Sequence, residues 1–220
     1  MTDLLPKHGG YRKLRSFQVS QLIYDVTVRF CGRYIERTSR TRDQMTQAAR
    51  SGVQNIAEGS QVSATSKKME LKLTQVARAS LEELRLDYED FLRQRGMPKL
   101  EPQHPALVRF KELRCKTLEE VQGWVTQERN KNTDNQRRKK TGGTDDEKRT
   151  VVPVSCGQFS SVFPLSYSCL AANAALSLLN VATYLLDRQV QRLAKDFETE
   201  GGFTERLYKI RSAKRSESLK

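Results

Sequence analysis

The sequence predicts an all-α fold: an up-and-down antiparallel four-helix bundle with a long insertion between the third and fourth helices. Apolar residues recur every three or four positions through four long stretches, which is the spacing of one buried helix face. Capping residues, glycines and prolines lie at the ends of these stretches. Short connections between the first three favour antiparallel packing. The expected helices cover about residues 14 to 38, 42 to 58, 66 to 95 and 170 to 198.

The first two expected helices are separated by the segment "TSRTRDQ". At the start of the second, Thr41 and Gln44 have the spacing of a capping box. Gly59 has the position of a C′ residue that ends this helix. The first helix has a basic face opposite an apolar face, which consists of Val19, Leu22, Ile23, Val26, Phe30 and Tyr34.

The stretch "RSGVQNIAEGS", residues 50 to 60, places polar residues beside small apolar ones. It could be an active-site loop or the packed end of a helix. Ala48, Ala49 and Gly52 are small enough to let another helix approach closely, and Asn55 and Glu58 are three residues apart, a spacing that lets them bond to neighbouring groups. We therefore interpret the stretch as the close-packed end of the second helix.

The third helix is the longest amphipathic run, and Gly96 and Pro98 end it. The fourth helix begins in a chain segment without charge. The predicted organisation is residues 1–96 for the first three helices, 97–168 for the insertion, 169–202 for the fourth helix and 203–220 for a basic tail. The insertion has a weaker helical pattern at 105–128. A basic linker at 129–150 has no apolar residue, so we expect it to be disordered.

The 220-residue chain carries a net charge of +13, which favours association with polyanions such as nucleic acid. Residues 11 to 42 contain eight basic and two acidic residues. Within them Arg29, Arg33 and Arg37 repeat every four positions, so they should line one flank of the first helix and contact successive phosphates. The predicted nucleic-acid-binding residues are Arg29, Arg33, Arg37, Arg40 and Arg42, with Arg137, Arg138, Lys139 and Lys140 as a flexible basic arm in the linker.

Three long strings carry a family resemblance: "QMTQAARSGVQNIAEGS", "ELKLTQVARASLEELRLDYEDFLRQRG" and "NAALSLLNVATYLLDRQVQRLAKDFETEGGFTERL". The first two resemble the four helix bundle proteins related to those encoded in intervening sequences of bacterial 23S ribosomal RNA genes. The third is similar to the four helix suffix segment of a subset of that family. The resemblance covers about residues 12 to 96 and 169 to 211.

The resemblance implies an up-and-down bundle without catalytic activity. It also implies a basic homo-oligomer, with a pentameric ring as the expected form, that associates with nucleic acid or with a reverse transcriptase. The accessory protein of diversity-generating retroelements belongs to the same group. The simplest members pass almost directly from third to fourth helix, whereas this sequence has the insertion.

The sequence contains no phosphate-binding glycine motif and only two histidines, His8 and His104, which we expect in solvated loops. We expect no enzyme activity, no metal and no cofactor. Four separated cysteines, Cys31, Cys115, Cys156 and Cys169, form no C-x-x-C pair, and the N-terminus has no signal-peptide pattern. We therefore expect free thiols in a cytoplasmic protein.

Two other functions stay open. One is a protein-interaction scaffold that does not bind nucleic acid and has no salt-sensitive affinity for polyanions. The other is membrane association, because residues 162 to 186 carry no charge over a length that could span a bilayer. The polar residues within that stretch and its amphipathic continuation favour a buried bundle helix, so we expect no membrane contact.

Overall fold

The computed structural model describes residues 9–141, 165–201 and 203–218, and this part of the chain is all-α, without strands. His8, Cys156 and the 142–150 part of the expected linker lie outside the described residues. A short 3-10 turn, Tyr11–Lys13, precedes the helices. The helices are α1 (Arg15–Tyr34), α2 (Arg40–Val62), α3 (Lys67–Gln94), α4 (Pro105–Leu113), α5 (Leu118–Thr141), α6 (Tyr167–Glu200) and α7 (Phe203–Ser218).

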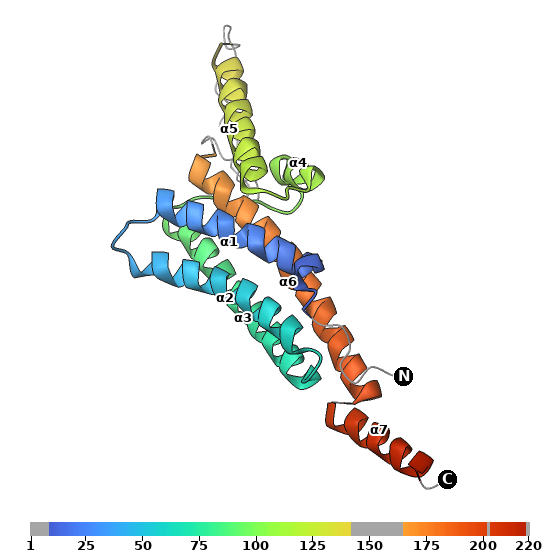
Figure 1. Ribbon diagram of the computed structural model, residues 1–220. Coiled ribbons are helices and arrows are strands. Elements are labelled where there is room, and N and C mark those ends of the chain that lie inside the picture. The colour runs from blue at the N-terminus through green and yellow to red at the C-terminus, as the bar shows by residue number, and fades with distance from the viewer. Residues whose placement is uncertain (1–8, 142–164, 202, 219–220) are drawn as a thin grey trace, which may run out of the picture.

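Helices α1, α2, α3 and α6 pack into one helical bundle (Figure 1). Each of α2 and α6 contacts α1, and α3 lies against both α2 and α6. A single hydrophobic core joins the four helices, so α6 closes a core begun by helices far earlier in the chain. Helices α4 and α5 lie at one end of the bundle, and α7 lies beyond the opposite end (Figure 1).

The boundary between α1 and α2 differs from the prediction. Helix α1 ends at Tyr34 because Ile35 takes an extended conformation and packs partly buried against the core. The N-cap of α2 is Ser39, which directly precedes Arg40, and its side chain makes no capping hydrogen bond. The predicted capping box at Thr41 is therefore wrong: Thr41 already lies inside the helix.

Gly59 does not end α2, which continues to Val62. A Cβ atom on Gly59 would lie 3.4 Å from both the Glu70 carbonyl oxygen and the Leu73 Cβ atom of α3. Helix α3 therefore lies in van der Waals reach of this position, and no left-handed backbone is involved. Nearby, the Asn55 Nδ2 atom donates to the Ser51 carbonyl oxygen at 2.8 Å. These contacts support the interpretation of this stretch as a packed helix.

Replacing Gly52 with alanine should destabilise the protein. The new Cβ atom would lie 2.6 Å from Cδ2 and 2.9 Å from Cγ of Leu81, which is fully buried, so the leucine side chain would have to shift within the core. Overpacking typically costs about 1–3 kcal/mol and alanine's helix propensity offsets about 1 kcal/mol of it, so we expect the free energy of unfolding, measured in urea, to fall by up to about 2 kcal/mol. Gly32→Ala is the control, because nothing lies within 4 Å of its Cβ position. Equal stability of the two variants would contradict the close-packing argument.

An aromatic cluster fills the core where α1 meets α3. The Phe30 ring centroid lies 4.9 Å from that of Tyr88 and 4.7 Å from that of Phe91, both in edge-to-face geometry. The Tyr88 hydroxyl donates to the Thr27 Oγ1 atom at 3.0 Å, so the buried phenol has a polar partner. Burial raises the pKa of Tyr88 far above its usual value.

Asp87 on α3 should reduce stability at neutral pH. Burial, followed by the nearby Glu83 and Asp90 carboxylates, raises its pKa from 3.8 to about 6. A carboxyl whose pKa is raised on folding destabilises the fold above that pKa, and the penalty disappears as pH falls below the unfolded value. We expect Asp87→Asn to raise the melting temperature by about 2–4 °C near pH 7, and to leave it unchanged near pH 4. A gain that is the same at both pH values would count against this explanation.

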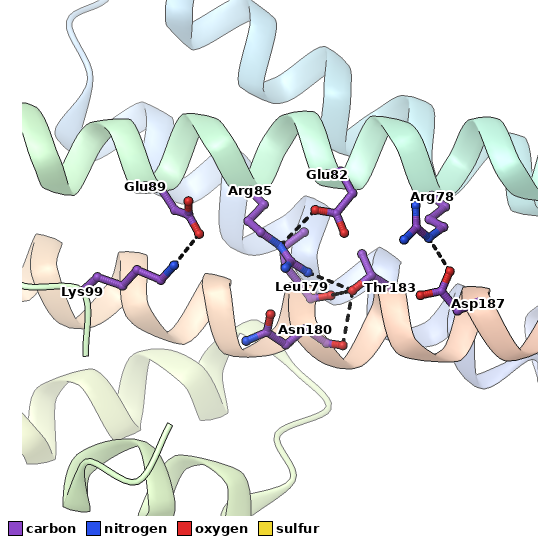
Figure 2. Close-up of polar contacts among 9 residues, drawn as sticks. All are labelled: Arg78, Glu82, Arg85, Glu89, Lys99, Leu179, Asn180, Thr183 and Asp187. Carbon is purple, nitrogen blue, oxygen red and sulfur yellow. Dashed lines mark hydrogen bonds and ion pairs between the residues drawn. The ribbon is translucent and has the colours of Figure 1, made fainter. Parts of the chain in front are cut away.

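Polar contacts connect α6 to α3 along their exposed seam (Figure 2). Arg78 of α3 pairs with Asp187 of α6, and the Arg85 Nη2 atom donates to the Thr183 Oγ1 atom at 2.9 Å. The Arg85 Nε atom also lies 3.3 Å from a Glu82 carboxylate oxygen. The contacts of Arg78 and Arg85 with α6 join groups about one hundred residues apart in sequence, so they help to fix the position of α6 against α3.

The insertion forms two helices where the sequence predicted one weak helix at 105–128. The chain breaks between them at Arg114, whose φ of 49° is left-handed. Trp124 of α5 packs on Phe110 of α4 with ring centroids 4.7 Å apart. The Arg109 guanidinium binds the buried Glu128 carboxylate through two contacts of 2.7 and 2.6 Å. The insertion is therefore a packed helical pair.

Helix α5 also includes residues 129–141, which we expected to lie in a disordered linker. Burial of Val121, Trp124 and Val125 anchors the first turns of α5. An anchored helix propagates without a new nucleation step, and no glycine or proline interrupts the chain between Gly123 and Gly142. Residues 203–218 of the predicted tail are likewise helical, as α7.

Helix α6 is long and apolar enough to cross a membrane, with a window of mean hydropathy 1.6, but 72% of that window is buried inside the structure. Its polar Asn173 is buried as well. The Asn173 Oδ1 atom accepts from the Leu100 backbone N–H at 2.7 Å, and its Nδ2 atom donates to the Pro98 carbonyl oxygen at 3.0 Å. The contacts of α6 within the bundle thus account for its apolar composition.

Candidate nucleic-acid interface

Two of the predicted arginines, Arg29 and Arg33, lie exposed on the last two turns of α1. The core-facing residues Val26 and Phe30 fix the rotation of this helix, and Arg29 and Arg33, each three residues further on, lie about 60° round the helix axis at the exposed edge of the buried face. Neither arginine forms an ion pair with any residue that the structure describes. Their charge is therefore available to an external anion.

The remaining arginines of the first group lie around the α1–α2 turn. Arg37 is not on the flank of α1, because the helix ends three residues before it, and the predicted series of three helical arginines is wrong at this position. Arg40 and Arg42 lie in the first turn of α2. Arg42 lines a shallow depression together with Arg29, Arg33, Val28 and Gly32. The N-terminus of α2 adds its own positive potential there.

The second group, Arg137, Arg138, Lys139 and Lys140, belongs to the last turns of α5. Their side chains lie outside the described residues. Figure 1 shows α5 rising away from the bundle, and at 1.5 Å per residue Arg137 lies about 16 Å along the helix from Thr126. The structure therefore does not bring this group together with Arg29 and Arg33.

A pocket of about 230 Å³ lies beside Arg29 and Arg33, where α1, α5 and α6 meet. Both arginines line it, as do the rings of Tyr34 from α1 and Tyr167 from α6. Helix α5 supplies one wall. The other lining residues are Val26, Phe30, Leu118, Val121, Gln122, Val125, Thr126 and Ala171. The site thus combines an apolar floor, two phenol rings and two guanidinium groups.

The pKa of Tyr34 is affected by the charged groups around the pocket. Burial raises the pKa of Tyr34, while the charges of Arg33 and Arg29 act to lower it and Tyr167 acts to raise it. Tyr167 is 43% exposed, and the Arg129 guanidinium lies 5.9 Å from its ring centroid. The two phenol rings thus lie among the positive charges of Arg29, Arg33 and Arg129, and positive charge of this kind attracts anions.

Sequence reasoning missed the contributions of Tyr167, Gln122 and Arg129. Tyr34 had been assigned only to the apolar face of the first helix. The position of Tyr34 directly after Arg33 is a local sign that an aromatic ring lies beside this cation. No local signal could have found Tyr167, because only the packing of α6 against α1 and α5 brings it to this pocket.

Other reactive side chains have structural roles. Cys31 and Cys169 are buried free thiols, and burial raises the pKa of each to about 11, so both stay protonated at neutral pH. His104 lies in the loop before α4, partly exposed, and as the N-cap of this helix it accepts from the Ala106 backbone N–H. Within the described ranges, no three His, Cys, Asp or Glu side chains gather as a metal site.

Comparisons of the chain with protein-family models, with curated proteins and with solved structures found no match.

Proposed function

We propose that this protein is a non-enzymatic, basic helical bundle that binds RNA or DNA in the cytoplasm. The observation that carries the proposal is the group formed by Arg29, Arg33 and Arg42, which lie together on the surface. Arg29 and Arg33 have no ion-pair partner among the described residues. Guanidinium groups held in this way can each bind a phosphate oxygen, and such contacts supply affinity without sequence choice.

We further propose that α1, α2, α3 and α6 form an up-and-down antiparallel four-helix bundle of the family related to 23S ribosomal RNA intervening-sequence proteins. Support for the bundle comes from the contacts of α6 with α1 and α3, and from the alternating course of the four helices in Figure 1. The family assignment depends on the resemblance of the "SGVQNIAEG" and "VARASLEEL" strings.

A homo-oligomer, with a pentamer as the expected form, is part of the same proposal. Val181 and Tyr184 of α6 are 45% and 57% exposed, and such apolar surface is available to a second copy of the chain. A nucleic-acid enzyme such as a reverse transcriptase is the proposed partner, which the protein would supply with bound nucleic acid. Light scattering of the purified protein measures the subunit number directly.

The test of nucleic-acid binding is fluorescence anisotropy of nucleic-acid-free protein with single-stranded, duplex and hybrid probes over a salt series. The logarithm of the affinity should fall linearly with the logarithm of salt concentration, and the slope counts the phosphates engaged. Absence of binding to every probe at low salt would reject the proposal. It would favour a protein-interaction scaffold, for which the exposed Val181 and Tyr184 would be the first surface to test.

A further inference from the structure

The pocket beside the arginines has features that phosphate binding does not require. Phosphate recognition needs only exposed cations and N–H donors. Here Arg29 and Arg33 also border a concave space with an apolar floor, which includes Phe30 and Val125. Concave apolar sites with a few polar groups at the edge are typical of small, flat ligands.

The two tyrosines give this space its chemical character. Tyr34 packs on the buried Phe30 ring with centroids 5.2 Å apart, so its ring is held in place. Tyr167 lies at the first position of α6, after the N-cap Ser166, which anchors the helix start by accepting from the Cys169 backbone N–H at 3.1 Å. A packed phenol ring such as that of Tyr34, and an exposed one at a fixed helix start such as that of Tyr167, are suitable stacking surfaces for nucleobases.

We infer that the pocket between α1, α5 and α6 binds one unpaired base of a single-stranded nucleic acid, with a phosphate next to that base on Arg29 and Arg33. This inference depends on the proposed function. The bases of a duplex are paired and stacked inside the helix, so only an unstacked base can enter a pocket. The site therefore selects single strands over duplexes.

The inference also gives the insertion a role. Leu118, Val121 and Val125 of α5 form the apolar part of one wall, and Gln122 adds an amide to it. The Thr126 hydroxyl already donates to the Gln122 carbonyl oxygen of its own helix at 3.0 Å. The Gln122 side chain is thus the polar group of this wall that is free to reach the edge of a base. Without α5, Arg29 and Arg33 would still be exposed, but the pocket would lack one of its walls.

The test compares a short single-stranded RNA with an abasic strand that has the same number of phosphates. The wild-type protein should bind the base-containing strand about tenfold more tightly, since stacking of one base contributes about 1–3 kcal/mol. Tyr167→Ala should remove this difference without changing the salt slope. Tyr208→Ala is the matched control, because Tyr208 is also an exposed tyrosine, 73% exposed, and it lies on α7, beyond the end of the bundle opposite α5 (Figure 1).

Each outcome separates the two proposals. Equal affinity of the wild-type protein for both strands, or equal losses in the two tyrosine variants, would overturn the base pocket while leaving phosphate binding intact. A free nucleoside monophosphate that binds as tightly as the strand would instead identify a mononucleotide site and overturn the single-strand inference. No binding of any probe at low salt would reject the proposed function and the pocket together.

Discussion

Replacing Leu84 with aspartate is expected to unfold the protein. Leu84 lies in the centre of α3 with 0% of its surface exposed, and it belongs to the core that joins all four bundle helices. The variant would bury a carboxylate without a partner and lose the packing of a leucine, a combination that costs about 4 kcal/mol or more. Circular dichroism should show loss of helix or a strongly lowered melting temperature.

Leu86→Asp is the matched control for that variant. Leu86 lies two residues away on the same helix and is 62% exposed, so the same substitution should change stability by about 0.5 kcal/mol or less. If Leu84→Asp melted like the wild-type protein, the described core would be wrong. If both variants unfolded, Leu86 would have to be covered by another chain, which would itself support an oligomer.

The double substitution Arg29→Glu with Arg33→Glu is expected to weaken nucleic-acid binding about 100-fold at low salt. Each charge-assisted phosphate contact contributes about 1.5 kcal/mol, which is about tenfold in affinity, and the loss of both should lower the salt slope by about two. Both residues are exposed, so the fold should be retained. Anisotropy titrations over a salt series measure both quantities.

Arg188→Glu with Arg192→Glu makes the same change of net charge elsewhere. These arginines are also exposed and four residues apart, but they lie on the C-terminal half of α6, which Figure 1 shows running away from α5. We expect a much smaller loss of affinity, because only long-range and screened electrostatics would change. Equal losses in the two double variants would mean that the overall charge, and not the site on α1, attracts the nucleic acid.

The four long helices could be predicted because each buries one stripe, and the spacing of that stripe is a local property of the sequence. Their ends were less predictable. Ile35 leaves the helical conformation to pack against the core, which moved Arg37 off α1, and Gly59 stays helical because α3 approaches it. In both cases a contact with a distant residue overrides the local capping signal.

The candidate site likewise has features that the sequence predicts and features that it does not. The basic character of α1 and the exposure of Arg29 and Arg33 follow from the sequence alone, because the apolar stripe of α1 determines which face is buried. The sequence could not predict that α5 begins beside these arginines, or that Tyr167 completes the pocket. Those placements depend on α6, which the chain reaches only after the whole insertion.

The sequence by itself determined the helical class, the four amphipathic stretches and the positive charge of the first of them. These are determined by local periodicity and composition, which need no knowledge of the partners. Only the tertiary structure decided which arginines share a surface, how the insertion is built and where a pocket forms. Side-chain packing between segments distant in the chain creates these features, and that packing leaves no periodic signal in the sequence.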